Sequence, residues 1–410
     1  MRAVTETFLA FLQQGFTAFG GPVSHVAHFR RAFVRKRSFL SEEAFAELLA
    51  MCSALPGPTS TQVAFGIGIT RAGIAGGVAA WIGFTLPAAV MLATAGAILG
   101  AGSGATSIGH QLGHAGWVVG VKAFAVAVVA HAVWGMGHQF AASAPRAAFA
   151  TLVAIGAFVA ERLGGSWSAF AQPALIATGA AAGLLLGWST APTAGPQAAP
   201  DGGNPRVPRA AGVLAALLFA ALVALAVFSP LAPPVARAGA TCFGAGALVF
   251  GGGHVVLPLL ERPFVEHGWL QADAVLAGYS LAQAAPGPLF AMAAFLGAAM
   301  CADAGPAASA GAAAFLTVAI FLPGMLLVVV AFPAWQRLRA SDQVQRAIAG
   351  CCTAVVGILA SALASPVIPA GIVDAWTASI AAVSLALVAW GRVPIPAIAA
   401  AAALAGWLSP

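Results

Sequence analysis

Charged side chains are scarce in this sequence of 410 residues, of which only 7% are Asp, Glu, Lys or Arg and 60% are hydrophobic. A water-soluble domain needs a largely polar surface, so this balance excludes an ordinary soluble protein. Apolar stretches near the ~20 residues that cross a bilayer recur along the chain. Examples are residues 73–99, 212–228, 315–333 and 375–390. The composition therefore predicts an all-α, multi-pass membrane bundle.

Paired metal and disulfide motifs are also missing. The five cysteines contain no Cys-x-x-Cys pair, which argues against a disulfide framework or a cysteine zinc site. His110 with His114, and His131 with His138, share helical faces, but no nearby carboxylate or thiolate completes a ligand set. We therefore expect no bound metal.

Motifs for nucleotide-driven or hydrolytic chemistry are absent from the sequence. It has no P-loop, no hydrolase triad and no Gly-x-Gly-x-x-Gly after a strand, so an ATP-driven pump or a membrane reductase is disfavoured and no cofactor is expected. The first 25 residues lack a cleavage site of small residues after an apolar run, so we expect no removable signal peptide. The net charge of +6 comes from short loops, where it sets orientation in the membrane and does not indicate nucleic-acid binding.

An internal repeat appears when the chain is shifted against itself by about 231 positions. The shift aligns Phe19-Gly20-Gly21 with Phe250-Gly251-Gly252, Arg31-Ala32-Phe33-Val34 with Arg262-Pro263-Phe264-Val265, Pro56-Gly57-Pro58 with Pro286-Gly287-Pro288, and Leu86-Pro87 with Leu322-Pro323. A Pro, Gly and Ala-rich loop at 189–209 and an apolar span at 211–228 lie between the copies. We expect a first repeat at 1–188, a linking segment at 189–235 and a second repeat at 236–410.

Each repeat divides into six hydrophobic elements. They are expected at 5–36, 42–69, 74–100, 115–138, 145–163 and 168–188, and again at 237–267, 272–300, 306–333, 343–363, 370–390 and 393–409. Glycine and proline interrupt the first two elements of each repeat, so continuous helices are disfavoured there. Broken backbone at membrane depth requires protein or a watery cavity around it. These elements are therefore predicted to be pairs of half-helices.

The distribution of Lys and Arg distinguishes two membrane arrangements, because these residues favour the cytoplasmic side. If every element crosses, seven of the eighteen lie inside and ten outside, with Lys122 within a span. If the first two elements of each repeat re-enter, fourteen lie inside and only Arg162, Arg237 and Arg262 outside. The second arrangement agrees with the rule. It makes the two repeats inverted relative to one another, an architecture of secondary transporters.

Half-helices that start at membrane depth present free backbone N–H groups, which attract anions. Four such starts converging on one cavity would suit a small dianion without a fixed ammonium group. The predicted substrate-binding residues flank the breaks. They are Gly20, Gly21, Pro22, His25, Pro56, Gly57, Pro58, Thr59, Ser60, Gln62, Gly251, Gly252, Gly253, His254, Gln283, Pro286, Gly287 and Pro288.

These segments resemble the chromate ion transporter (CHR) family of bacterial membrane proteins, in its long two-domain form. The resemblance rests on Phe19-Gly20-Gly21-Pro22 followed by Phe29-Arg30-Arg31, on Leu55-Pro56-Gly57-Pro58 with Gln62, and on their second-half partners, and it spans nearly the whole chain. It implies efflux of chromate driven by the proton-motive force, with chromate resistance as the outcome and sulfate as the natural look-alike. Phe39 departs from the pattern, since such sequences often have Trp there.

The sequence leaves two interpretations open for the role of several candidate residues. Arg30 and Arg31 either orient the protein or funnel the substrate, and Lys122 either couples transport or extends its ammonium to the interface. His25 and His254 either carry a proton or make structural hydrogen bonds. Apart from Glu47, the carboxylates lie in loops or at span ends, so the coupling ion is open.

The function expected is chromate export across the bacterial inner membrane. Uptake or exchange of sulfate or a related oxyanion is the alternative, and a membrane-embedded enzyme is a remote one with few polar groups to support it. The partners expected are the dianion and the lipid bilayer, with a homodimer left open.

Overall fold

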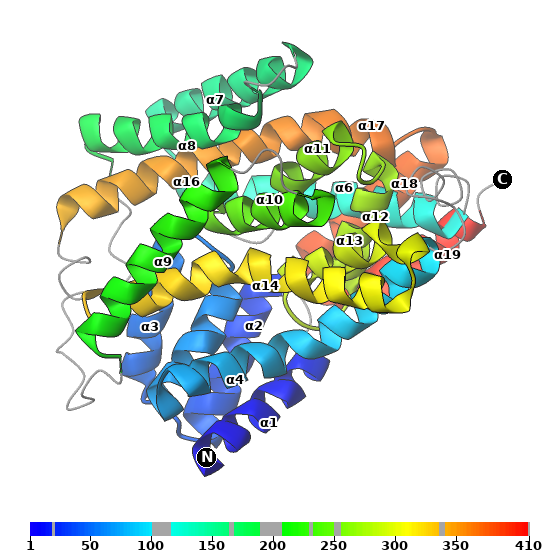
Figure 1. Cartoon of the computed structure of the whole chain (residues 1–410). Helices are drawn as coiled ribbons and strands as arrows, with labels where there is room; N and C mark the ends of the chain where they lie inside the picture. Colours follow the sequence, from blue (N-terminus) through cyan, green and yellow to red (C-terminus); the bar gives the residue numbers. More distant parts are fainter. Residues whose placement is uncertain are drawn as a thin grey trace.

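Helices form every regular element that the computed structural model describes, namely in residues 1–18, 21–100, 116–163, 168–188, 207–228, 233–249, 256–335 and 341–408 (Figure 1). Within these residues, five helices are long and apolar enough to cross a membrane. They are Thr59–Gly100, Gly116–Phe140, Arg209–Ala226, Pro306–Ala331 and Asp342–Gly371. The all-α, multi-pass class expected from the sequence is confirmed.

The first two elements of the N-terminal half are broken where glycine and proline predicted. Helix α1 (Arg2–Thr17) ends at Ala18, whose backbone is extended with φ −87° and ψ 102°, and α2 (Gly21–Phe29) starts shortly after it. α2 continues into a π-helical segment (Arg30–Lys36). Helix α3 (Glu42–Ala54) is separated from α4 (Thr59–Gly100) by the Pro-Gly-Pro turn.

The C-terminal half has the same order of elements. Helix α10 (Pro234–Leu248) precedes α11 (Val256–Glu266), and a second Pro-Gly-Pro turn follows α12 (Ala272–Ala284). After that turn the chain forms a short 3₁₀ segment (Leu289–Ala291) and then α13 (Met292–Met300). Broken helices thus occur in both halves at corresponding positions.

Helix α4 is two helices joined by a tight reversal. Ala72 and Gly73 have non-helical backbone angles, and Gly73 has a φ of +68°. A Cβ atom on Gly68 or Gly76 would collide with the backbone of the other, so the two segments pack directly against each other. The sequence predicted separate elements at 42–69 and 74–100, as observed. In the C-terminal half, Gly305 with φ +97° precedes α14 (Pro306–Ala331), which packs on α13.

The later helices pack across the two halves of the chain. Helix α16 packs against α7 and α8, as Figure 1 shows, and α6 packs against α18 and α19. A side chain on Gly350 would collide with the backbone of Gly179, and one on Gly120 with that of Ala402, so both helix pairs depend on glycine for their close approach. The bounds are α6 (Gly116–Phe140), α7 (Ala144–Leu163), α8 (Ser168–Leu185), α16 (Asp342–Ala362), α18 (Ala375–Trp390) and α19 (Ile395–Trp407).

Helix α9 (Arg209–Phe228) joins the two halves and packs on α14. Only 11% of its most apolar window is buried, and Val213, Leu214 and Leu217 are more than 60% exposed. An apolar surface of this kind on a membrane protein faces lipid hydrocarbon. A π-helical segment (Leu363–Val367) and α17 (Ile368–Gly371) follow α16.

Candidate transport site

The two Pro-Gly-Pro turns are each bonded to the opposite half of the chain. The Gly57 N–H donates to the Val249 carbonyl at the end of α10 at 2.6 Å, and the Gly287 N–H donates to the Ala18 carbonyl at the end of α1 at 3.0 Å. Gly57 and Gly287 have φ values of +126° and +103°, which L side chains rarely adopt. The turns therefore hold the two halves together through paired backbone contacts at the helix breaks.

Each turn also packs on a proline-containing helix from the opposite half. A Cβ atom on Gly57 would lie 3.1 Å from the Cα of Gly324 in α14, and one on Gly287 would lie 3.0 Å from the Cβ of Ala88 in α4. Gly324 follows Pro323 and Ala88 follows Pro87, both inside their helices. The structure thus brings the turns and two proline-containing helices into contact.

Gln62 bridges the first turn and α14. This side chain is 1% exposed, and its Nε2 donates to the Pro56 carbonyl at 2.8 Å and to the Gly324 carbonyl at 3.3 Å. Its Oε1 is buried without a hydrogen-bond partner among the described residues, as is the Thr61 hydroxyl. An unpaired buried polar group costs about 1–3 kcal/mol, so the first turn holds two polar groups with unsatisfied hydrogen-bonding capacity.

The start of α4 lies where the sequence predicted a half-helix. Thr59 is its first residue, Ser60 is buried, and the N–H groups of Thr61 and Gln62 both donate to the Pro58 carbonyl at 2.9 Å. The first amides of a helix carry partial positive charge, and those of Thr59 and Ser60 precede the two that are bonded to Pro58. Hydroxyl and amide donors are therefore gathered at this turn.

His25 is isolated in the interior. It is 1% exposed, and its ring meets Phe84 edge-on with 5.2 Å between centroids. The ring lies beside the backbone of Ala18, but neither nitrogen makes a hydrogen bond of good geometry to a described residue. His25 therefore lies next to the helix end that receives the Gly287 N–H.

The remaining predicted residues fall into two groups. Gly21 and Pro22 begin α2, and Gly20, Gly251, Gly252, Gly253 and His254 lie outside the described residues. Gln283 lies on α12 just before Pro286 and Pro288 and donates from Nε2 to the hydroxyl of Tyr279 at 2.9 Å. Its amide is therefore anchored within its own helix.

The basic candidates lie away from the turns. The Arg30 Nε pairs with the Glu42 carboxylate at 2.7 Å with half of its side chain exposed, and Arg31 is exposed. Lys122 is buried, and its Nζ lies 2.7 Å from the carboxylate of Asp273, whose side chain is 34% exposed. The pair joins α6 to the first turn of α12. Sequence reasoning missed it, because no local pattern links two residues so far apart.

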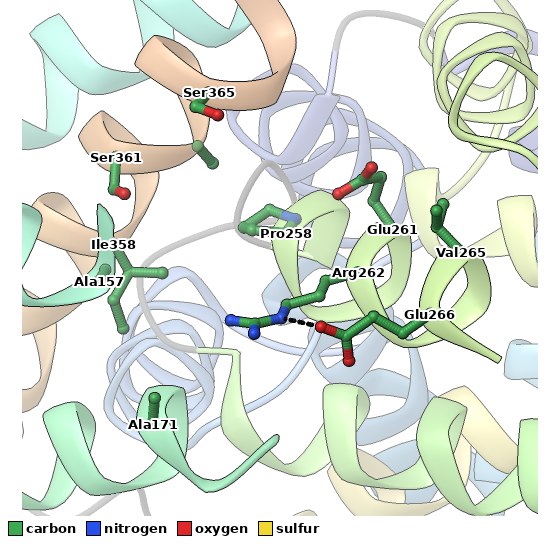
Figure 2. Close-up of a pocket in the computed structure, with 11 residues that line it drawn as sticks. Ala157, Ala171, Pro258, Glu261, Arg262, Val265, Glu266, Ile358, Ser361 and Ser365 are labelled. Carbon is green, nitrogen blue, oxygen red and sulfur yellow. Dashed lines mark hydrogen bonds and ion pairs between the residues drawn. The ribbon is translucent and has the colours of Figure 1, made fainter. Parts of the chain in front are cut away.

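A further cavity, which the sequence did not predict, lies between α7, α8, α11 and α16 (Figure 2). It is lined by Glu261 and Arg262, and Glu261 is 9% exposed. The expectation that carboxylates other than Glu47 lie in loops or at span ends is wrong for Glu261, because α11 extends through it and packs on α12 and α16. Among the described residues, no group of His, Cys, Asp and Glu could hold a metal ion.

Long apolar helices broken at glycine and proline, with a buried polar turn between the two halves, are the features of a multi-pass membrane protein. The chain belongs to the chromate transporter family, whose model, described as "Chromate transporter", matches residues 5–242 and 236–407.

Named relatives span nearly the same length. The chain is 29% identical over 417 residues to the "Chromate transport protein" of Pseudomonas aeruginosa, covering 98% of this chain and 92% of the relative. It is 25% identical over 408 residues to the "Chromate transport protein" of Cupriavidus metallidurans, with the same coverage. The "Probable chromate transport protein" of Synechococcus elongatus is 24% identical over 86% of this chain and 82% of the relative. No solved structure matches the chain with significance.

Proposed function

We propose that this protein exports chromate across the bacterial inner membrane and so confers chromate resistance. Membership of the family supports a transporter, and the printed names of full-length relatives support chromate as its cargo. The structural observation that supports the proposal is the backbone hydrogen bond from each Pro-Gly-Pro turn to the opposite half of the chain. Secondary transporters built from inverted repeats bind their substrates at the interface of the repeats, next to broken helices, so this junction supports the proposal.

The two units are inverted repeats at 1–188 and 236–410, joined by the segment 189–235. The paired bonds of Gly57 and Gly287 and the crossed packing of α6 and α16 support this organisation, as does the double match of the family model. The first two elements of each repeat re-enter from the side they left. The distribution of Lys and Arg, fourteen inside and three outside, supports this arrangement.

The anion is held by hydrogen-bond donors at the first turn. Thr59, Ser60 and the amides that open α4 supply donors there, and the charge of Lys122 is already balanced by Asp273. Donors arranged around a tetrahedral dianion select shape and double charge. Sulfate shares both properties with chromate, so it is the competing substrate.

The direction of transport is tested in everted membrane vesicles, in which an exporter accumulates its substrate. Energised vesicles that contain the protein should take up radiolabelled chromate faster than vesicles with the Gly57→Leu variant, and a protonophore should remove the difference. Accumulation in intact cells with none in everted vesicles would show uptake and contradict export.

The inverted arrangement is tested by labelling from one side of the membrane. Trp269 is 8% exposed, so the neighbouring His267, which is exposed, carries the second cysteine. In a background lacking the native cysteines, an impermeant maleimide added to intact spheroplasts should modify His267→Cys but not Ser38→Cys. Permeabilised cells should show both sites labelled. Modification of both sites in intact spheroplasts would refute the inverted arrangement.

A further inference from the structure

The cavity beside α11 contains a buried cationic donor. Its volume is about 140 Å³, room for about four or five water molecules at ~30 Å³ each. Its polar lining is limited to Glu261, Arg262, Glu266, Ser361 and Ser365. The rest of the lining is apolar and comes from four helices, so the cavity lies between elements of both halves of the chain.

Arg262 is oriented toward the interior of this cavity. Its Nε donates to the Glu266 carboxylate at 2.7 Å, and its side chain is 14% exposed. Its Nη2 is buried without a hydrogen-bond partner among the described residues. Figure 2 shows the guanidinium extending from α11 toward Ile358, while the Glu261 carboxylate points away from it. Glu266 thus fixes the guanidinium, which lines the cavity, through its Nε.

We propose that this cavity is a second oxyanion site, separate from the Pro-Gly-Pro turns, in which Arg262 binds a tetrahedral dianion. A planar guanidinium is the side chain best suited to the oxygens of such an ion, and the Ser361 hydroxyl on α16 adds a donor. The ligand class is the one that the proposed transport function requires, so the inference rests on that function.

The acidic neighbours make this a weak site. The carboxyl group of Glu261 lines the same cavity and disfavours a dianion there, and Glu266 already uses part of the charge of Arg262. Weak binding suits a site from which a transported ion must leave. Arg262 lies six positions beyond the start of α11, about 9 Å along the helix at ~1.5 Å per residue. In the inverted arrangement this is the outward side of the midplane, so the site lies on the exit path.

The test measures protection of a cysteine inside the cavity by sulfate. Ala157 lines the cavity from α7 and is partly exposed, so Ala157→Cys in a background lacking the native cysteines reports access. Sodium sulfate should slow its modification by a maleimide several-fold in purified protein, relative to sodium chloride at equal ionic strength. Sulfate is used because chromate oxidises thiols.

Two cavity variants should then move the protection in opposite directions. Arg262→Gln should abolish it, whereas Glu261→Gln should lower the sulfate concentration required by about tenfold, because one nearby like charge is removed. Arg392→Gln removes the same charge from an exposed site and should leave protection unchanged. Arg262→Lys keeps the positive charge but lacks the planar, paired donors of the guanidinium. Its protection should lie between that of the unsubstituted cavity and that of Arg262→Gln, which tests the site even if Arg262→Gln fails to fold.

Protection that survives Arg262→Gln, or that Glu261→Gln weakens, would overturn the site. Failure of the second site and failure of the transport proposal give different combinations of sulfate protection and chromate flux. Chromate flux without sulfate protection would remove the second site alone, and protection without any chromate flux would remove the transport proposal on which its role depends.

Discussion

Replacing Gly57 by Ala tests whether the first Pro-Gly-Pro turn holds the two halves together. The φ of +126° costs a residue with a side chain of order 1–3 kcal/mol. The new Cβ would also lie 2.7 Å from the Gln62 Nε2, so the amide must move from the Pro56 and Gly324 carbonyls. Each hydrogen bond contributes about 0.5–1.5 kcal/mol net. The substitution should therefore destabilise the native arrangement by roughly 2–6 kcal/mol.

The assay is thermal denaturation of the detergent-solubilised protein, with chromate flux measured in parallel. Gly57→Ala should lower the midpoint by several degrees and slow flux at least tenfold, and Gly57→Leu should abolish flux. Gly137→Ala is the matched control, because nothing lies within 4 Å of its added Cβ. Alanine favours a helix by about 1 kcal/mol over glycine, so this control should be neutral or stabilising. If Gly57→Ala behaved like Gly137→Ala in both measurements, the turn would not join the halves.

Three further predictions concern polar groups. Replacing Thr59 and Ser60 together by Ala should weaken apparent chromate affinity about tenfold or more in competition assays, since two donors are lost; unchanged affinity would exclude these hydroxyls. Asp273→Asn should destabilise the protein by about 1–3 kcal/mol, because it leaves the buried Lys122 ammonium without its partner. Lys122→Gln should destabilise it less, because the Asp273 carboxylate that remains is partly hydrated. A larger loss of stability in Lys122→Gln than in Asp273→Asn would show that the lysine is hydrated. Lys122→Gln should also change the rate or pH dependence of flux more than affinity, and loss of chromate binding would instead indicate a fixed-charge site.

The positions of the broken helices followed from local chemistry. Two prolines flanking a glycine disfavour a continuous helix, so the breaks at 55–58 and 285–288 were predictable from the residues alone, whereas the single Pro87 and Pro323 lie inside helices. The reversal at Gly73 was also predictable, because a glycine and short polar segment separate two apolar stretches.

The contacts between distant residues were not predictable in the same way. The bond from Gly57 to Val249 and the ion pair of Lys122 with Asp273 depend on how helices pack in three dimensions. Glu261 occupied a charged stretch that resembled a loop, and only the continuation of α11 through it buries the carboxylate. Tertiary packing decided each of these cases.

The central claim is that this chain moves a tetrahedral dianion through a bilayer without altering it. The direct measurement is flux of radiolabelled chromate into proteoliposomes of purified protein under a membrane potential, with chromium speciation determined before and after. We expect saturable chromate flux that sulfate inhibits and that nitrate and chloride inhibit only weakly, with all chromium recovered as chromate. Flux no greater than in protein-free liposomes, or recovery of reduced chromium, would contradict the claim.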